Sequence, residues 1–381
     1  MNISMLVLNN FINDARVYKE ASTLAAAGHT VMVIALWHPG LASDEFMAGF
    51  RVIRLHLRSR SWRNRLFSPS IKYLEYAWRV WSLARHEHSQ VYHANDANTL
   101  PAAWLAAKQN RAKLVYDAHE LETGRSFSST KITGIYRKLW ALPERIFIHR
   151  VNDIITVSQS IAEELVRIYH VKMPEVILNC PEKNSIPPSN RLRNELHIKE
   201  SQKVSLYQGR ITPGRGIETF SEAIQSIGNV VGVVLGDGPL LSAFRQNCQL
   251  GKWKGVYFPG QVALDDLPFY TASADIGIVL TQDTCLNHHY SLPNKLFEYL
   301  HAGLPVVGSK IPEVERIIRE YQVGELVDPE DPNSIADGIQ MILADPIRYQ
   351  NMKANALKAA EIFNWQNESK KLLRLYDHLS T

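Results

Sequence analysis

The sequence predicts an α/β protein with two doubly wound, Rossmann-like domains, each built on a parallel sheet. Short runs of β-branched and other apolar residues alternate with segments of helical periodicity, a pattern typical of parallel strands joined by right-handed crossovers. The alternation stops once, between residues 180 and 201, where the sequence is rich in proline and polar residues. The length of 381 residues also exceeds what one hydrophobic core usually supports.

The first half is expected to form one sheet. Asp14 is a suitable N-cap for the first helix, which follows the loop NNFIN and ends at Gly28. We expect strands at residues 5–8, 30–36, 50–57, 90–95, 113–119, 153–158 and 175–179.

The second half repeats the pattern and ends in helices. Pro293 and Gly303 stand where a helix usually starts and stops, which predicts a helix over roughly residues 294–302. The chain is expected to be helical from residue 332 onward, with a break at Asn364 and Trp365. The expected strands are residues 203–209, 230–238, 255–260, 274–281 and 305–309.

These elements predict three parts of the chain. Residues 1–182 are expected to form an N-terminal domain, and residues 183–363 a C-terminal domain. The helix at residues 364–381 is expected to return to the N-terminal domain. The two sheets are expected to face a cleft at the carboxyl ends of their strands, where such folds bind ligands.

The composition is that of a soluble globular protein, with 45% hydrophobic and 21% charged residues. No stretch approaches the ~20 apolar residues of a membrane span, so we expect a cytoplasmic protein. Cys180, Cys248 and Cys285 are widely spaced, which argues against a disulfide framework or a zinc site and favours small buried residues. The net charge of +4 is too small to indicate a partner by itself.

Two loops of the second half carry candidate ligand contacts. Arg210 and Arg215 flank a Pro-Gly turn just before a helix, and guanidinium groups beside helix amides suit a diphosphate. A surface loop with two solvated arginines is the alternative. Gly236 and Gly238 end a strand, where glycines let the backbone approach a flat ligand such as a base.

The helix expected after Pro293 adds a third site. Its unpaired N-terminal amides, together with Lys295, favour phosphate oxygens. Glu298 lies one turn beyond Asn294, and a carboxylate there can accept hydrogen bonds from the vicinal hydroxyls of a ribose. The alternative is an ordinary helix with a solvated glutamate.

Strand ends in the first half place several polar side chains near the expected cleft. His93 and Asp96 follow one strand, and Asp117, His119 and Glu120 follow the next. Asp96 can also cap the helix behind it. A histidine at the position of His119 can donate to a sugar hydroxyl or to the developing charge of a leaving phosphate.

Several other chemistries are excluded by missing motifs. The sequence has neither GxGxxG after its first strand nor GxxxxGK[ST], which excludes the usual dinucleotide and P-loop sites, and it lacks the GxSxG elbow. It also has no DxD pair to hold a divalent cation against a pyrophosphate. We therefore expect catalysis without a metal.

In order and spacing, the motifs together resemble the family 4 retaining glycosyltransferases (glycosyl transferases group 1), which have the GT-B fold. The likeness covers essentially the whole chain. It is carried by DARVYKEASTLAAAGHTVMV, YHANDANTLPAA, LVYDAHEL, GRITPGRGIETF, GDGP, LPNKLFEYLHAGLPVVGS and the closing NW before a helix.

The resemblance implies transfer of a sugar from a nucleotide-diphosphate sugar to an acceptor hydroxyl, with the anomeric configuration kept and no cofactor. This is a hexosyltransferase activity of type EC 2.4.1. UDP-sugars are the favoured donors and GDP-mannose the second choice. A lipid-linked or saccharide acceptor in bacterial surface polysaccharide synthesis is expected.

The same resemblance assigns roles to residues. It places Arg210 and Arg215 on the diphosphate and His119 near the transferred sugar as catalytic groups. It implies an acceptor-binding N-terminal domain, residues 1–182, and a nucleotide-sugar-binding C-terminal domain, residues 183–363, with Asn10 and Asp14 in the loop that borders the acceptor. The strand-end positions add His93 and Asp96, and the place of the missing glutamate adds Tyr290, as acceptor or sugar contacts. Donor binding falls to Gly236, Gly238, Asn294, Lys295, Leu296 and Glu298.

This chain departs from the family pattern at three places. The first of the family's paired glutamates would fall at Tyr290, and Asp283, His288 and His289 are possible substitutes. Arg215 stands where a lysine is usual, which preserves the charge. The glycine-rich first loop is replaced by NNFIND.

Residues 51–85 predict contact with an anionic membrane. They contain nine lysines or arginines, a single acid, Glu75, and six interleaved aromatic residues. A second basic run spans residues 125–150. Alternatively, the aromatic residues face the core and the arginines are solvated, while nucleic-acid binding is not expected because no recognition module is present.

Two rival functions stay open for the whole chain. One is a nucleotide-sugar epimerase of the same fold, against which the paired arginines and Glu298 argue. The other is a non-catalytic nucleotide-sugar binding protein, in which the missing first glutamate marks lost activity.

Overall fold

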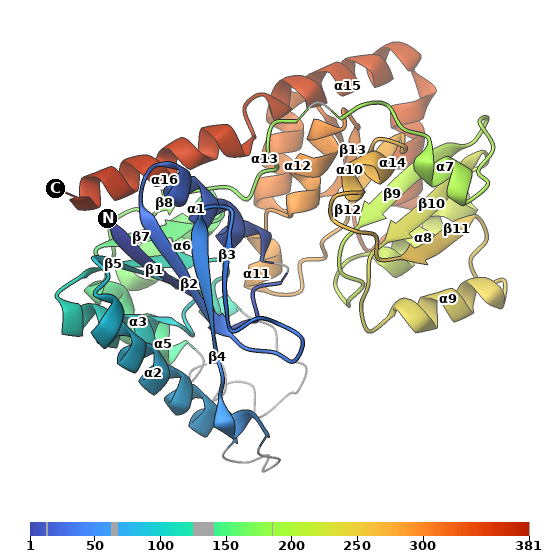
Figure 1. Ribbon diagram of the computed structural model, residues 1–381. Coiled ribbons are helices and arrows are strands. Elements are labelled where there is room, and N and C mark those ends of the chain that lie inside the picture. Colours follow the sequence, from blue (N-terminus) through green and yellow to red (C-terminus); the bar gives the residue numbers. More distant parts are fainter. Residues whose placement is uncertain (13, 62–67, 125–140, 185, 381) are drawn as a thin grey trace. The chain divides into compact units, whose positions relative to one another are not determined.

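The computed structural model describes all residues except 13, 62–67, 125–140, 185 and 381 (Figure 1). It divides the chain into two compact units, Met1–Leu178 with Glu368–Thr381, and Asn179–Asn367. Each unit is an α/β domain on a mainly parallel sheet, which confirms the predicted fold class. The crossings between the units lie at residues 178/179 and 367/368, whereas the sequence suggested 182/183 and 363/364.

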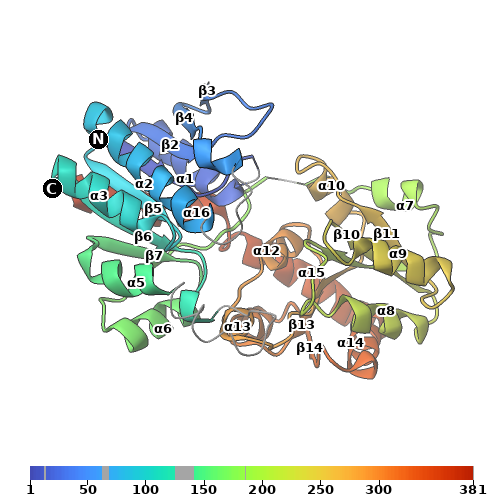
Figure 2. The ribbon, with the colours of Figure 1, turned by 90° about the horizontal axis from the view of Figure 1, so that it is seen from below.

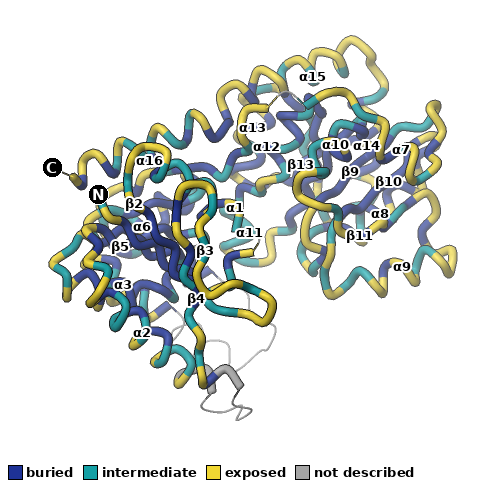
Figure 3. The backbone as a smooth tube through the Cα atoms, viewed as in Figure 1, coloured by how far each residue is buried: buried dark blue, intermediate teal, exposed yellow. Residues whose placement is uncertain are grey.

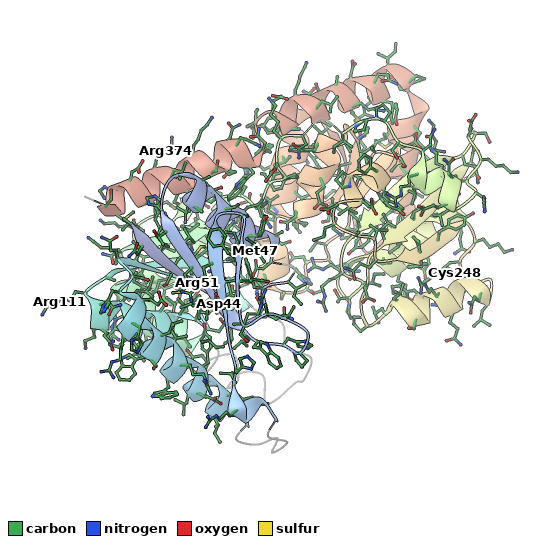
Figure 4. All side chains as sticks on the ribbon, in the orientation of Figure 1. Asp44, Met47, Arg51, Arg111, Cys248 and Arg374 are labelled. Carbon is green, nitrogen blue, oxygen red and sulfur yellow. The ribbon has the colours of Figure 1, made fainter. Side chains whose placement is uncertain are left out.

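The sheet of the first unit has eight strands in the order β3-β4-β2-β1-β5-β6-β7-β8. Neighbouring strands pair in parallel except β3 and β4, which are antiparallel. Arg51 on β4 donates two hydrogen bonds, of 2.6 and 2.9 Å, to the carboxylate of Asp44 on β3 (Figure 4). The strands are β1 (Asn2–Leu6), β2 (Thr30–Leu36), β3 (Asp44–Met47), β4 (Phe50–Leu55), β5 (Val91–Asn95), β6 (Lys113–Ala118), β7 (Asp153–Thr156) and β8 (Glu175–Val176).

The helices of this unit cover both faces of the sheet. The predicted cap of α1 is present, because the Asp14 carboxylate accepts the Val17 N–H at 3.3 Å. Helices α2, α3 and α5 lie side by side on one face (Figures 1 and 2). The crossovers that contain α2, α3 and α5 all move toward the β8 edge of the sheet, whereas the crossover from β1 to β2 moves toward the β3 edge. Because such crossovers are right-handed, α1 covers the other face. The helices are α1 (Ala15–Ala26), α2 (Ser68–Glu87), α3 (Leu100–Asn110), α5 (Leu142–Phe147) and α6 (Gln159–Tyr169), with short 3-10 turns at Arg58–Ser61, Glu122–Gly124 and Ile148–Arg150.

Helix α16 (Trp365–Ser380) closes the first unit from the far end of the chain. Tyr376 is fully buried, and its hydroxyl lies 2.7 Å from Nδ1 of His93. The Glu368 carboxylate accepts a hydrogen bond from the N–H of Leu178 at 2.8 Å. This bond joins the two residues of the first unit at which the chain passes to and from the second unit.

The sheet of the second unit has six parallel strands in the order β11-β10-β9-β12-β13-β14. The strand order reverses between β9 and β12, the point at which doubly wound sheets bind ligands. The strands are β9 (Lys203–Gln208), β10 (Val230–Leu235), β11 (Val256–Gly260), β12 (Ile276–Val279), β13 (Val306–Ser309) and β14 (Gly324–Val327). The helices are α7 (Arg191–Glu195), α8 (Ile217–Gln225), α9 (Leu241–Gln249), α10 (Leu267–Thr271), α11 (Leu286–His289), α12 (Asn294–His301), α13 (Pro312–Tyr321), α14 (Pro332–Ala344) and α15 (Pro346–Ala360).

The central strands of each unit form its core (Figure 3). Every residue of β10 is buried, as expected for a strand covered on both faces. Strands β3 and β14 were not predicted from the sequence. They lie at the sheet edges and their residues are largely half-buried or exposed, so their hydrophobic signal is weak. The segment 180–201, expected to be a plain connection, contains α7 and belongs to the second unit.

None of the three cysteines forms a disulfide; Cys180 is buried, and Cys248 and Cys285 are half-buried. Cys248 lies on α9 (Figure 4). None of the helices in the described part of the chain is both long enough and apolar enough to cross a membrane.

Candidate active site

The candidate donor-binding residues gather at the switch point of the second sheet. They follow the carboxyl ends of β9, β10 and β12, or lie on α12. The loop after β9 contacts the loop after β12, since the Gln282 N–H donates to the Gly214 carbonyl at 3.0 Å. Residues far apart in the sequence therefore form one local site within the second unit.

The arginine loop, residues 209–216, is held in a single shape by close packing. Gly216 has a φ of +63°, and a Cβ there would lie 2.6 Å from Cβ of Leu280. A Cβ on Gly214 would lie 2.7 Å from Cε1 of His288. Arg210 is exposed and Arg215 half-buried, so both guanidinium groups are accessible to an anion.

Gly236 and Gly238 pack closely against the arginine loop. A Cβ on Gly236 would lie 1.8 Å from the Gly209 carbonyl oxygen, and one on Gly238 would lie 2.2 Å from that of Ile211. The Ile211 N–H also donates to the Asp237 carbonyl at 2.9 Å. The glycines therefore make room for the arginine loop, and the approach of a base to this backbone stays a prediction.

Helix α12 begins as predicted, with Pro293 as the extended residue before Asn294 and with Gly303 at a φ of +64° after its end. Asn294 is exposed, which leaves it available to a ligand. Leu296 is fully buried and its N–H donates to the Pro293 carbonyl at 3.0 Å. The predicted phosphate contact by Leu296 is therefore not available in this conformation.

Lys295 points back toward the end of β9. Its Nζ lies 3.4 Å from the centre of the Tyr207 ring. Burial lowers the pKa of Lys295 well below its usual value, and the charge of nearby Arg215 lowers it further, while Glu298 opposes the change. The surroundings thus disfavour the positive charge of Lys295, and a diphosphate would supply negative charge that favours it.

Glu298 is half-buried. The alternative interpretation required a glutamate that projects freely into solvent, and the structure does not show this. Its Oε2 accepts a hydrogen bond from Nε2 of Gln208, the last residue of β9. Gln208 was not predicted as a site residue. A glutamine at a strand end has no distinctive sequence signal, so this contact could be found only in the structure.

Tyr290 occupies the position of the first family glutamate at the end of α11. It is half-buried, and its ring packs edge-on against His289 at 5.0 Å. Nδ1 of His289 lies 2.7 Å from Asp283 Oδ2, and Nδ1 of His288 lies 2.8 Å from Thr284 Oγ1. The possible substitutes named from the sequence thus form one cluster beside the arginine loop.

The first unit has its own polar cluster, centred on His119 at the end of β6. Nε2 of His119 lies 3.0 Å from Asp117 Oδ2, and Nδ1 lies 3.7 Å from Asp96 Oδ1. Burial alone would lower the pKa of His119, but the charges of Asp117 and Asp96 raise it to about 10. His119 is therefore a partly exposed cation at neutral pH, suited to donating a hydrogen bond and not to accepting a proton.

Arg16 of α1 binds the carboxylate of Asp117, which in turn contacts His119, and it was not predicted as a site residue. Its Nε donates to Asp117 Oδ2 at 2.7 Å and its Nη2 to Asp117 Oδ1 at 3.0 Å, while Nη1 donates to the Ile177 carbonyl at 2.7 Å. The available signal was a pair of charges four residues apart, Arg16 and Glu20, on the buried face of an otherwise apolar helix.

Two predictions for this cluster are corrected. His93 is fully buried between β1 and α16, and burial lowers its pKa to about 4, so it is a neutral core residue that no substrate reaches in this structure. Asp96 does not cap α3, whose N-cap is Thr99. Instead, Asp96 adopts a φ of +65° and faces His119.

The loop after β1 carries the remaining candidates. Asp14 caps α1 and also accepts a hydrogen bond from Asn9 Nδ2 at 2.8 Å. The Asn10 carbonyl accepts from Arg54 Nε at 3.1 Å, which anchors the loop to β4. Both Asn10 and Asp14 are half-buried, so their roles toward an acceptor stay predictions.

A metal fits poorly at the one cluster of possible ligands found among the described residues of the first unit. Glu20, His93 and Asp117 offer ligand atoms within 4.8 Å of one another. However, the Arg16 guanidinium lies 3.1 Å from Glu20 and 2.7 Å from Asp117, so the positive charge is already supplied. Burial also raises the pKa of Glu20 to about 8, which disfavours the ionised form that a metal needs.

The basic segment, residues 51–85, is partly internal. Arg54 is buried and pairs with Glu45 at 2.6 Å, and Arg79 pairs with Glu75 at 2.8 Å. Tyr76 is in the core, whereas Trp78 is 58% exposed, so neither interpretation of the aromatic residues holds for all of them. Trp62, Arg63, Arg65 and Phe67, and residues 125–140 of the second basic run, lie outside the described residues.

Comparison with known protein families matches both halves of the chain. A family model described as Glycosyltransferase Family 4 matches residues 15–180, and one described as Glycosyl transferases group 1 matches residues 188–359. The chain is 27% identical over 285 residues to an uncharacterised glycosyltransferase of Methanocaldococcus jannaschii, covering 70% of this chain and 69% of that protein. It is 24% identical over 376 residues to a phosphatidyl-myo-inositol mannosyltransferase of Mycobacterium tuberculosis, covering 96% and 92%.

Solved structures share the whole architecture. Sucrose-phosphate synthase from Thermosynechococcus elongatus superposes with a TM-score of 0.83 at 20% identity, covering 100% of this chain and 99% of the other. The Anabaena protein HepE, in complex with UDP and glucose, superposes with a TM-score of 0.77 at 17% identity, covering 99% and 100%. At these identities the likeness establishes the fold alone.

Proposed function

The chain belongs to the family 4 glycosyltransferases and has their GT-B fold, and from this premise we propose that it transfers a hexosyl group from a nucleotide-diphosphate sugar to an acceptor hydroxyl with retention of configuration. The observation that carries the proposal is the site at the switch point of the second sheet. There, a loop with two accessible arginines lies beside helix α12, which carries Lys295, whose charge burial disfavours, and the oriented carboxylate of Glu298.

Each group matches a part of the proposed donor. The cations suit the diphosphate, because fixed positive charge stabilises the negative charge that develops as the sugar departs. The Glu298 carboxylate suits the ribose hydroxyls, because it accepts hydrogen bonds only. UDP-sugars are our favoured donors and GDP-mannose the second, and the UDP complex of HepE supports this order.

The chemistry proposed for the first unit is electrostatic. His119 is held as a cation by Asp117 and Asp96 and donates a hydrogen bond near the sugar or the leaving phosphate. Since it carries its proton at neutral pH, it does not serve as the general base. In this mechanism the leaving phosphate accepts the proton of the acceptor hydroxyl, and neither a metal nor a carboxylate nucleophile takes part.

Release of the nucleoside diphosphate tests this proposal. Purified protein would be incubated with UDP- and GDP-sugars in the presence of lipid-linked and saccharide acceptors, with and without a chelator. The proposal predicts acceptor-dependent release that the chelator does not alter, with an anomeric configuration that matches the donor. Binding of the sugar nucleotide without turnover for any acceptor would favour the non-catalytic alternative, and interconversion of the donor sugar would favour an epimerase.

A lipid-linked acceptor at the inner face of the cell membrane is the second part of the proposal. It is favoured by the outer face of the helix layer α2, α3 and α5. On the described residues of these helices and of the turn Ile148–Arg150, no acidic side chain is exposed. The exposed side chains there include Leu74 (67%) and Trp78 (58%) together with Arg85, Lys108 and Arg145. Apolar side chains among cations suit an anionic bilayer surface.

Co-sedimentation with vesicles tests the membrane contact. The protein is expected to bind vesicles that contain an anionic phospholipid better than neutral ones, and the paired change Leu74→Ser and Trp78→Ser should reduce binding several-fold. Leu250→Ser is the matched control, because Leu250 is 75% exposed on the second unit. Equal binding to both kinds of vesicle would exclude this part of the proposal.

A further inference from the structure

The carboxylate of Glu298 is the end of a buried hydrogen-bond chain that crosses the second unit. Nε2 of Gln208 donates to Glu298 Oε2, and Oε1 of Gln208 accepts from Thr271 Oγ1 at 2.9 Å. Gln208 is 2% exposed and Thr271 is 1% exposed. These hydrogen bonds therefore link α10, the last residue of β9 and α12, and most of the atoms involved are shielded from water.

The chemistry of the three side chains fixes the direction of each bond. An ionised carboxylate only accepts, so the atom of Gln208 that faces Glu298 must be its NH₂ group. The amide oxygen then faces the Thr271 hydroxyl, whose single proton is shared between this oxygen and the Leu267 carbonyl, each 2.9 Å from Thr271 Oγ1. Without that hydroxyl, the amide oxygen would be buried and unpaired, which costs free energy and favours another rotamer.

A second contact ties the same two elements together. The hydroxyl of Tyr299 accepts the Gln208 N–H at 3.1 Å and donates to the Leu206 carbonyl at 2.8 Å. Tyr299 is fully buried and directly follows Glu298. The backbone of α12 is thus held against β9 independently of the Gln208 side chain, so a substitution of that side chain acts mainly on the side chain of Glu298.

We propose that Gln208 and Thr271 are positioning residues that hold the Glu298 carboxylate in the orientation that selects ribose over 2′-deoxyribose in the donor nucleotide. The inference rests on the proposed function, in which Glu298 binds the ribose hydroxyls. A carboxylate that can rotate would still offer negative charge, but it would lose the alignment with a diol that gives discrimination between sugars. Selectivity for ribose, more than affinity for phosphate, is therefore the property that these residues control.

Calorimetric titration with UDP, GDP and their 2′-deoxy counterparts tests this inference. The wild-type protein is expected to prefer the ribonucleotide about tenfold, the size of effect that one charge-assisted hydrogen bond gives. Gln208→Leu should weaken ribonucleotide binding about tenfold and leave deoxynucleotide binding nearly unchanged, so that the ratio approaches one. Thr271→Val should lower the ratio several-fold, and Thr271→Ser, which keeps the hydroxyl, should restore it.

The possible results separate this inference from the proposed function. If the wild type prefers ribose but both Gln208→Leu and Thr271→Val keep that preference, the positioning role is wrong. The same holds if folded variants, checked by circular dichroism, lose both nucleotides equally, because that result indicates a packing role. If the wild type binds none of the four diphosphates, the donor site itself is refuted and this inference falls with it.

Discussion

Gly236→Ala tests whether close backbone packing builds the donor site. Gly236 has a φ of +143°, and a Cβ there would lie 1.8 Å from the carbonyl oxygen of Gly209. That oxygen belongs to backbone and cannot rotate away as the tip of a side chain can. The added methyl group must therefore push the chain at Gly209, and the neighbouring Arg210 with it.

The expected magnitude is the sum of two costs. A non-glycine residue in a sparsely populated backbone region costs about 1–3 kcal/mol. Forcing an extra carbon into a packed site adds about 1–3 kcal/mol. We expect Gly236→Ala to lower the free energy of unfolding of the second unit by roughly 2–6 kcal/mol. Gly251→Ala is the matched control, because Gly251 lies in the same unit at a φ of +73° with no atom within 4 Å of an added Cβ.

Denaturant unfolding and UDP or GDP titration of both variants provide the measurement. Gly251→Ala should cost about 1 kcal/mol, typical of glycine at positive φ, and bind nucleotide like the wild type. Gly236→Ala should be clearly less stable and should bind the diphosphate at least several-fold more weakly. Equal stability and affinity in the two variants would refute the idea that contact between the glycine loop and the arginine loop shapes the site.

Three further predictions follow from the site. Glu298→Ala should weaken donor binding, while Arg210→Ala should mainly lower turnover; steady-state kinetics check both, and unchanged kinetics in both variants would remove the assignment. Because the pKa of His119 is raised from its usual value to about 10, its contribution to stability is complete below about pH 6.5 and is lost as pH rises toward 10; His119→Gln should remove that dependence from denaturant unfolding curves, and an unaltered pH profile would contradict the charged state. The negative diphosphate should raise the lowered pKa of Lys295, so that donor binding takes up protons between the pKa of the free protein and that of the complex and weakens as pH rises through this range; calorimetry in two buffers of different ionisation enthalpy measures this uptake, which should be absent in Lys295→Arg.

Strong local signals made most of the fold predictable. The buried strands and the capped helix after Asp14 follow from composition and spacing, as does the helix between Pro293 and Gly303. Edge strands such as β3 and β14 are half-exposed, so their residues lack a continuous apolar run. Domain crossings were displaced by a few residues because proline and polar residues mark the end of regular structure and not the limit of packing.

The candidate site was predictable only where a residue type limits the chemistry. Arginines beside a Pro-Gly turn and a glutamate one turn into a helix suggest anion and ribose contacts by themselves. The supporting residues Gln208, Thr271 and Arg16 gain their meaning from partners that are 90, 63 and 101 positions away. His93 shows the opposite error, since a strand-end position suggested exposure, but α16 returns from the end of the chain to cover it.

Thermal unfolding of the full chain with nucleotides tests the central claim most directly, because a ligand that binds only the folded state raises its stability with concentration. The protein would be melted with UDP, GDP, their sugar conjugates and the corresponding monophosphates, in the wild type and in Arg215→Ala. The account predicts stabilisation by one diphosphate family, greater than by its monophosphate, and a smaller effect in Arg215→Ala. No stabilisation of well-folded wild-type protein by any of these nucleotides would contradict the account and leave only the fold.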